Sequence, residues 1–74
     1  MTLQQLKYLV AVANSGSINA AAKSLYISQP SLSEVIQNLE QELGFSIFER
    51  TSKGINITQQ GMEIIRESND IVHS

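Results

Sequence analysis

Two short helical patterns, separated only by residues 26–28, constrain the fold of this chain more than any other feature. The first pattern, from Ile18 to Leu25, is rich in alanine, so a second helix can cross closely over it. The second opens with Ser28 and Pro30, which favour a helix start, and it places small polar side chains on its first turns. This arrangement is typical of a helix-turn-helix, in which the leading end of the second helix can enter a groove of DNA.

The chain has 74 residues, which suits one small domain. Such a core buries only about 60% of the surface that the unfolded chain exposes, so we expect a second copy or a missing remainder to support it. The absence of cysteine excludes disulfides and thiolate metal sites and suits a reducing cytoplasm. No export signal begins the chain, and no apolar segment approaches the ~20 residues that span a bilayer. These features predict a soluble cytoplasmic protein that does not enter a membrane.

The net charge of −2 is unusual for a chain that binds nucleic acid. Residues 1–54 contain four basic and four acidic side chains, and the remainder contains one basic and three acidic ones. The part expected to face DNA is therefore neutral. Because neutralisation of phosphates supplies most non-specific affinity, a single copy is expected to bind weakly, and to need local basic clustering or a second copy.

A first helix is predicted before the helix-turn-helix. Thr2 and Gln5 fit a capping box, and the apolar spacing that follows continues to about Asn14. Gly16 is expected to stop this helix, and Ser17 can cap the next one. The inward stripe of that second helix is predicted to be Ile18, Ala21, Ala22 and Leu25.

The third helix is predicted over residues 28–43 and ends at Gly44. Ser28 can accept from backbone N–H groups of its first turn, and Pro30 stands where its missing donor does no harm. The predicted buried face consists of Leu32, Val35 or Ile36, Leu39 and Leu43.

A β-hairpin, or wing, is predicted next, because residues 48–50 and 55–57 alternate with period two and residues 51–54 have turn chemistry. Phe45 and Ile47, with the apolar residue after them, are expected to anchor the first strand. Two short strands are not stable alone, so the wing should lean on the helices. The predicted contacts are made by Phe48, Ile55 and Ile57.

A last helix is predicted after Thr58, which can cap it. Its partly apolar stripe comprises Met62, Ile65 and Val72, with Ile64 and Ile71 beside it. The sequence ends without a helix-ending Gly or Pro, so we expect a fragment cut within this helix. The predicted fold is mainly α: a winged helix-turn-helix with a three-helix core and a two-stranded wing, followed by the start of a further helix.

Several motifs now stand in a defined order: Ser28-Gln29-Pro30-Ser31-Leu32-Ser33, Leu39-Glu40, Glu42-Leu43-Gly44, Phe48-Glu49-Arg50, and Gly61 after Thr58. In this order and spacing they resemble the amino-terminal winged helix-turn-helix domain of LysR-type bacterial transcriptional regulators. The resemblance covers essentially the whole chain.

The resemblance implies that residues 1–58 form a DNA-binding domain for double-stranded DNA and that residues 59–74 begin a linker helix that pairs in a homodimer. Members of the family are usually much longer and carry a carboxy-terminal effector-binding domain of periplasmic-binding-protein type. A small-molecule effector is therefore expected only for the full-length protein. The expected dimerisation residues are Met62, Ile65, Ile71 and Val72; alternatively, Met62 and Ile65 pack on their own core.

Contacts to base edges are expected from the start of the third helix. The Gln29 amide can pair with N7 and N6 of adenine in the major groove. Ser31 and Ser33 can donate to a base or a phosphate, and Pro30 can contact a thymine methyl. The alternative is a solvated helix face with a cap at Ser28.

Glu34 departs from the family, which commonly carries Arg at this place. A carboxylate cannot bind phosphate, but it can accept a hydrogen bond from N4 of cytosine, which would give the protein its own base preference. Alternatively, Glu34 points away and pairs with Asn38 or a basic side chain.

Backbone contacts are expected around the wing and along the third helix. Lys53 at the hairpin tip is best placed for a phosphate or the minor groove. Arg50 can act similarly or can bridge to Glu49 or another acid. The full set of predicted backbone contacts is Ser28, Gln37, Arg50, Thr51 and Lys53.

An enzyme is not expected. His73 is the only histidine, and the acidic residues are scattered without metal-ligand spacing, so we predict no catalytic residue, cofactor or metal. The competing interpretation is a winged-helix module that binds protein instead of DNA, which the net charge and Glu34 favour. The small polar opening of the third helix and Lys53 argue against it, since a protein interface usually exposes more aromatic or Met anchors.

Overall fold

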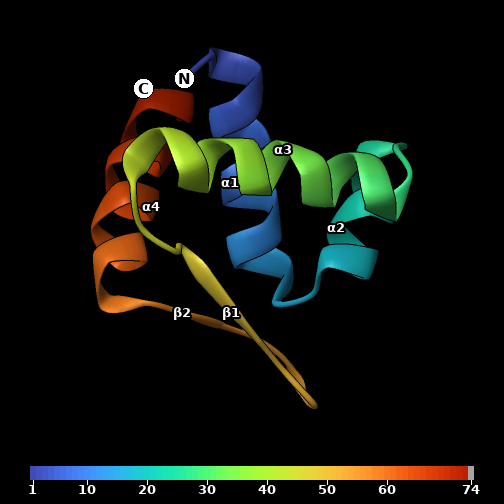
Figure 1. Ribbon diagram of the computed structural model, residues 1–74. Helices are drawn as coiled ribbons and strands as arrows, with labels where there is room; N and C mark the ends of the chain where they lie inside the picture. Colours follow the sequence, from blue (N-terminus) through green and yellow to red (C-terminus); the bar gives the residue numbers. More distant parts are fainter. Residues whose placement is uncertain (74) are drawn as a thin grey trace.

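The computed structural model describes residues 1–73, which form four helices and one two-stranded sheet. The elements in chain order are α1 (Leu3–Ser15), α2 (Ile18–Leu25), α3 (Gln29–Leu43), β1 (Phe48–Thr51), β2 (Gly54–Ile57) and α4 (Gln59–Val72). Helix α3 crosses α1, α2 lies near the leading end of α3, α4 stands on the other side of α1, and the hairpin extends from between α3 and α4 past the turn that joins α1 to α2 (Figure 1). The predicted mainly α winged helix-turn-helix is confirmed.

Each helix begins at a hydroxyl cap, as the sequence predicts. Thr2 and Gln5 form a complete capping box at α1. The hydroxyls of Ser17, Ser28 and Thr58 accept from the backbone N–H three residues on, at 3.3, 3.2 and 2.9 Å. Such caps are typically worth about 1 kcal/mol each, so short polar residues fix where the helices start.

The helix ends use left-handed backbone conformations. Gly16 and Gly44 close α1 and α3 with φ of 71° and 84°. Tyr26 closes α2 with φ of 59°, although this region is unfavourable for a side chain with a Cβ. The residue as a whole is 94% exposed. No local pattern around Tyr26 indicates this conformation, because left-handed helix ends usually carry Gly or Asn.

The core lies where α1, α2, α3 and the start of the hairpin meet. The predicted inward stripe of α2 is confirmed, with Leu25 half-buried at its edge. On α3, Ile36 is buried and Val35 half-buried, which resolves the alternative left by the periodicity. The largest fully buried side chains are Leu9, Val12, Leu32, Leu39 and Ile47.

The hairpin is longer than predicted, because Thr51 and Gly54 pair with each other and leave only residues 52–53 in the turn. Phe45 and Ile47 precede β1 instead of lying within it. Gly54 has φ of 131°, and a Cβ there would lie 3.0 Å from the Gly16 carbonyl oxygen. The wing therefore rests closely against the turn between α1 and α2.

Glu40 ties the start of the hairpin to α3. Its Oε2 accepts from the backbone N–H of Ile47 at 2.7 Å and of Phe48 at 3.3 Å. A charged acceptor for two N–H groups makes a strong local anchor. The position of the wing relative to α3 is therefore set partly by this carboxylate.

The start of α4 is anchored at the same place. The hydroxyl of Thr58 donates to the Ser46 carbonyl at 2.6 Å, and its N–H donates to the Ile47 carbonyl at 2.9 Å. A Cβ on Gly61 would collide with that Ile47 carbonyl, so α4 approaches as closely as only glycine allows. Helix α4 then packs along α1, with Ile64 and Ile65 against the core.

Candidate nucleic-acid interface

The leading end of α3 lies at the surface. Ser28, Pro30, Ser31 and Glu34 are exposed, whereas Leu32 on the opposite face is completely buried. This division follows from helical periodicity, since one apolar stripe holds the helix against the core. The polar side chains predicted to reach base edges are thereby presented on a rigid element.

Ser28 and Ser31 form a small hydroxyl pair at this end. The Ser28 hydroxyl donates to Oγ of Ser31 at 2.8 Å while it accepts the backbone N–H of Ser31. Its proton is thus engaged within the chain, and a phosphate contact by Ser28 would require this bond to break. Ser31 keeps its own proton for an outside acceptor.

Ser33 joins the recognition helix to the wing. Its Oγ accepts from Nε2 of Gln29 at 3.3 Å and from Nη2 of Arg50 at 2.9 Å. We call these three residues the Ser33 cluster. Gln29 and Ser33 are half-buried, and Arg50 is exposed. Within residues 1–73 the bond of Arg50 is to Ser33 and not to an acid, so the predicted bridge to Glu49 or another carboxylate is not formed.

The hairpin tip presents a positive charge. Lys53 is exposed in the two-residue turn, and its ammonium has no hydrogen bond or ion pair within the described part of the chain. The backbone N–H of Lys53 donates to Oγ1 of Thr51 at 3.3 Å, and that hydroxyl donates to the Gly54 carbonyl. Thr51 therefore stiffens the turn, while the Lys53 charge remains available.

Glu34 and Gln37 are exposed on the outer side of α3. Among residues 1–73, Glu34 forms no hydrogen bond or ion pair with Asn38 or with a basic side chain, so the alternative pairing is not observed. The ion pair present in these residues joins the amino terminus to Glu42. Nothing within the described chain therefore holds the Glu34 carboxylate away from a partner.

A hollow of about 190 Å³ lies between the start of α2, the leading end of α3 and the wing. Gln29 and Arg50 line it together with Ser17, which was predicted only as a helix cap, and Asn19, which was not predicted as a site residue. The helix-turn-helix geometry could have indicated them, because the first helix of that motif crosses the DNA backbone. The hollow is also lined by Ile18, Thr51, Gly54 and Ile55.

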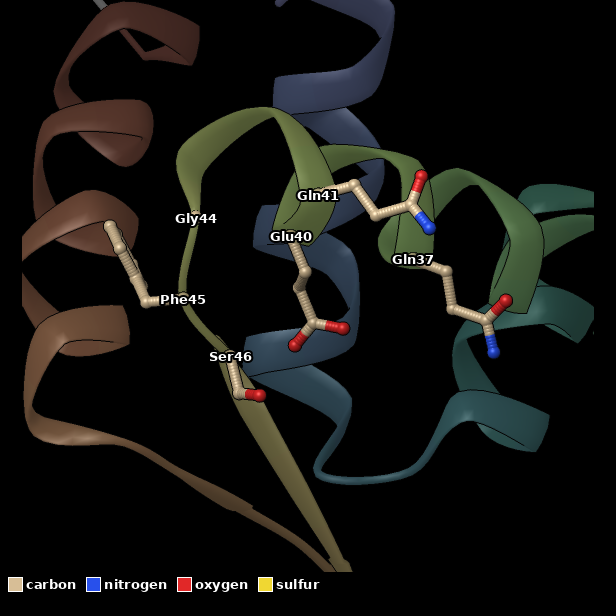
Figure 2. A pocket seen from close by; sticks show the side chains of 6 residues that line it. All are labelled: Gln37, Glu40, Gln41, Gly44, Phe45 and Ser46. Atoms are coloured by element: carbon tan, nitrogen blue, oxygen red, sulfur yellow. The ribbon is translucent and has the colours of Figure 1, made fainter.

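A larger hollow of about 390 Å³ lies at the trailing end of α3. Figure 2 shows the Gln37 and Gln41 amides on one side of it, Glu40 near Ser46, and the Phe45 ring turned toward α4. The lining has no basic side chain, and the Glu40 carboxylate already serves the start of the hairpin. This hollow therefore does not suit a phosphate and belongs to the support of the wing.

The residues predicted for dimerisation divide into two groups. Met62 and Ile71 are 59% and 53% exposed, whereas Ile65 and Val72 are half-buried. Ile65 packs against the core of its own chain, as the alternative for that residue expected. Met62 does not.

None of the helices within residues 1–73 is both long and apolar enough to cross a membrane. The same residues contain no group of three or more His, Cys, Asp or Glu side chains that could hold a metal ion.

Comparison with known proteins identifies relatives of one kind. Residues 3–62 match the family model described as "Bacterial regulatory helix-turn-helix protein, lysR family". The HTH-type transcriptional regulator ClcR of Pseudomonas putida is 44% identical over 73 residues, which are 99% of this chain and 25% of that protein. A probable RuBisCO transcriptional regulator of Porphyra purpurea is 48% identical over 65 residues, 88% of this chain and 20% of that protein. The chain thus spans about a quarter of the length of these relatives, which are named as regulators and not as enzymes.

Solved structures show the same fold. A complex of the CbnR DNA-binding domain with DNA has a TM-score of 0.93 and 40% identity, covering 99% of this chain and 84% of that one. A complex of the BenM DNA-binding domain with the catB site 1 DNA has a TM-score of 0.94 and 40% identity, covering 99% and 82%. CbnR, described as a LysR family transcriptional regulator, has a TM-score of 0.93 and 40% identity, covering 99% of this chain and 25% of that one.

Proposed function

The chain belongs to the lysR family of bacterial regulatory helix-turn-helix proteins, and from this premise we propose that it binds double-stranded DNA in a sequence-specific way, as the DNA-binding domain of a transcription regulator. The observation that carries the proposal is the polar leading end of α3, with hydroxyl and amide donors at the surface beside the positively charged wing. The solved complexes of similar domains with DNA support it.

In the proposed mechanism α3 enters the major groove and the wing lies on the phosphate backbone. The side chains at base edges are Gln29, Pro30, Ser31, Ser33 and Glu34. Lys53 supplies charge to a phosphate or the minor groove, with Thr51, Gln37, Ser28 and Arg50 as further backbone candidates. Only the base-edge contacts discriminate between sequences, because phosphates carry no sequence information.

The whole protein is proposed to be a longer cytoplasmic regulator with an effector-binding domain for a small molecule. Residues 1–58 would serve as the DNA-binding domain and residues 59–74 as the start of a linker helix that pairs in a homodimer. Two copies would place two α3 helices against a dyad-symmetric site. They would also double the number of phosphate contacts, which compensates for the absence of a net positive charge in each copy.

A titration with duplex DNA at two salt concentrations tests the proposal. Affinity that falls steeply as salt rises is expected, because phosphate contacts release counterions. Absence of binding to any duplex at low salt would contradict the proposal and support the protein-interaction alternative, which the net charge of −2 and the exposed Glu34 favour.

A further inference from the structure

We propose that Arg50 is a positioning residue that makes Ser33 a pure hydrogen-bond donor toward DNA, so that the base edge contacted by Ser33 must offer an acceptor. The inference rests on the proposed function. It gives Arg50 a role in base choice, in place of the phosphate contact expected for a cation on the wing.

The hydroxyl oxygen of Ser33 can form only a limited number of hydrogen bonds. A serine Oγ has one proton to donate and two lone pairs that can accept. In the Ser33 cluster both lone pairs are occupied, by Arg50 Nη2 at 2.9 Å and Gln29 Nε2 at 3.3 Å. The direction of the first bond is certain because a guanidinium can only donate.

The proton of Ser33 has no acceptor within residues 1–73. Two other helical serines differ: Ser24 and Ser68 donate back to the carbonyls of Ala21 and Ile64, at 2.9 and 2.7 Å. Ser33 lies half-exposed at the surface of α3 that borders the wing. An outside acceptor is therefore the natural partner for its proton.

This arrangement limits the bases that Ser33 can contact. In the major groove guanine offers N7 and O6, adenine offers N7 and thymine offers O4, whereas cytosine presents only the N4 donor. A hydroxyl whose lone pairs are both occupied cannot accept a hydrogen bond from the N4 amino group. The Ser33 position should therefore reject cytosine.

The same cluster orients Gln29. One Nε2 proton of Gln29 points to Ser33, which leaves the second proton and Oε1 for a base. This fixes the order of donor and acceptor on the amide, and adenine is the base that matches a donor and an acceptor side by side. Ser33 thus orients Gln29, whereas Arg50 acts on Ser33 alone and touches no base.

The test is a selection from random duplexes with the chain and its variants. Gln29→Ala marks the base position of the amide, and the other position that changes in Ser33→Ala is the one that the hydroxyl contacts. In the unchanged chain cytosine should be depleted there by about fivefold or more, the effect of one lost hydrogen bond. Arg50→Met frees one lone pair, so cytosine should return at that position while the rest of the selected sequence stays the same.

Two comparisons separate positioning from a phosphate contact. Lys53→Met removes the same charge from the same hairpin and should weaken all sequences alike, with the cytosine depletion intact. Arg50→Met added to Ser33→Ala should change the base preference no further, because the two residues act through one bond.

The inference is overturned if Arg50→Met keeps the cytosine depletion and only flattens the salt slope by about 0.9, as loss of one phosphate contact would. It is also overturned if Arg50→Met alters the preference equally when Ser33 is alanine. Failure of the unchanged chain to bind any duplex is a distinct result, which overturns the proposed function and this inference together.

Discussion

Hydroxyl groups of single serine and threonine residues set the geometry around α3. Ser28 fixes where the helix begins, Thr58 joins the start of α4 to the entry of the hairpin, and Ser33 joins α3 to the wing. Each oxygen combines a donor with acceptors, so one small side chain can satisfy two or three neighbours. Each of these hydrogen bonds helps to position the surface donors, and each can be removed by a single substitution.

Tyr26 is the residue whose backbone is least suited to its side chain. We expect Tyr26→Gly to stabilise the chain by about 1 kcal/mol, because glycine tolerates φ of 59° and the exposed ring loses little contact. Urea denaturation measures the change. Gln41→Gly, on an exposed helical position, is the control and should destabilise by about 0.5 kcal/mol. A lower free energy of unfolding for Tyr26→Gly would show that the tyrosine ring makes a stabilising contact.

At the scale of elements, the wing and α4 are held by a shared anchor. Glu40 binds the N–H groups that open β1, and the Ile47 carbonyl next to them accepts from Thr58 at the start of α4. Because these bonds meet at one short segment, displacement of α4 would also disturb the wing. The close approach of Gly61 to Ile47 is the tightest part of this anchor.

The substitution Gly61→Ala tests this anchor, because close packing and helix propensity predict opposite changes in the free energy of unfolding. Helix propensity alone predicts a gain of about 1 kcal/mol, but the added Cβ would meet a backbone carbonyl that cannot easily move. We expect a net loss of about 1–3 kcal/mol in the free energy of unfolding, measured with urea. Asn69→Ala, exposed on the same helix, should instead gain about 0.5 kcal/mol. Stabilisation by Gly61→Ala would contradict the close packing.

Elements could be predicted from the sequence because their signals are local. Caps at Thr2, Ser17 and Ser28 and the apolar stripe of α3 depend on residues a few positions apart, and the structure confirms them. The bond between Arg50 and Ser33 spans 17 positions and depends on how the wing docks. No periodicity indicates such a contact, so the sequence identified both residues as candidates but not their connection.

Taken as a whole, the molecule is a small domain with a net charge of −2, which does not favour tight binding to DNA. The net charge gives no long-range attraction to DNA, so we expect the affinity to come from local cations and from the proposed second copy. The exposed Met62 on α4 is a candidate contact for that copy, whereas Ile65 already packs on its own core.

We therefore expect Met62→Gln to leave the fold intact and to raise the dissociation constant of the proposed homodimer about tenfold or more, since burying such a side chain is worth about 1.5–3 kcal/mol. Sedimentation equilibrium measures this constant. Asn14→Ala, an exposed position at the end of α1, is the control and should have no effect. An unchanged constant for Met62→Gln would exclude this residue from the interface.

We propose that the leading end of α3 contacts base edges while the wing contacts the phosphate backbone. This division of roles can be tested by comparing Gln29→Ala and Lys53→Ala in titrations with a selected site and with random duplex, over a range of salt concentrations. We predict that Gln29→Ala lowers affinity for the selected site only, by about 1–3 kcal/mol, and that Lys53→Ala weakens both duplexes alike and flattens the salt slope by about one unit. Equal losses on both duplexes for both variants would contradict the claim.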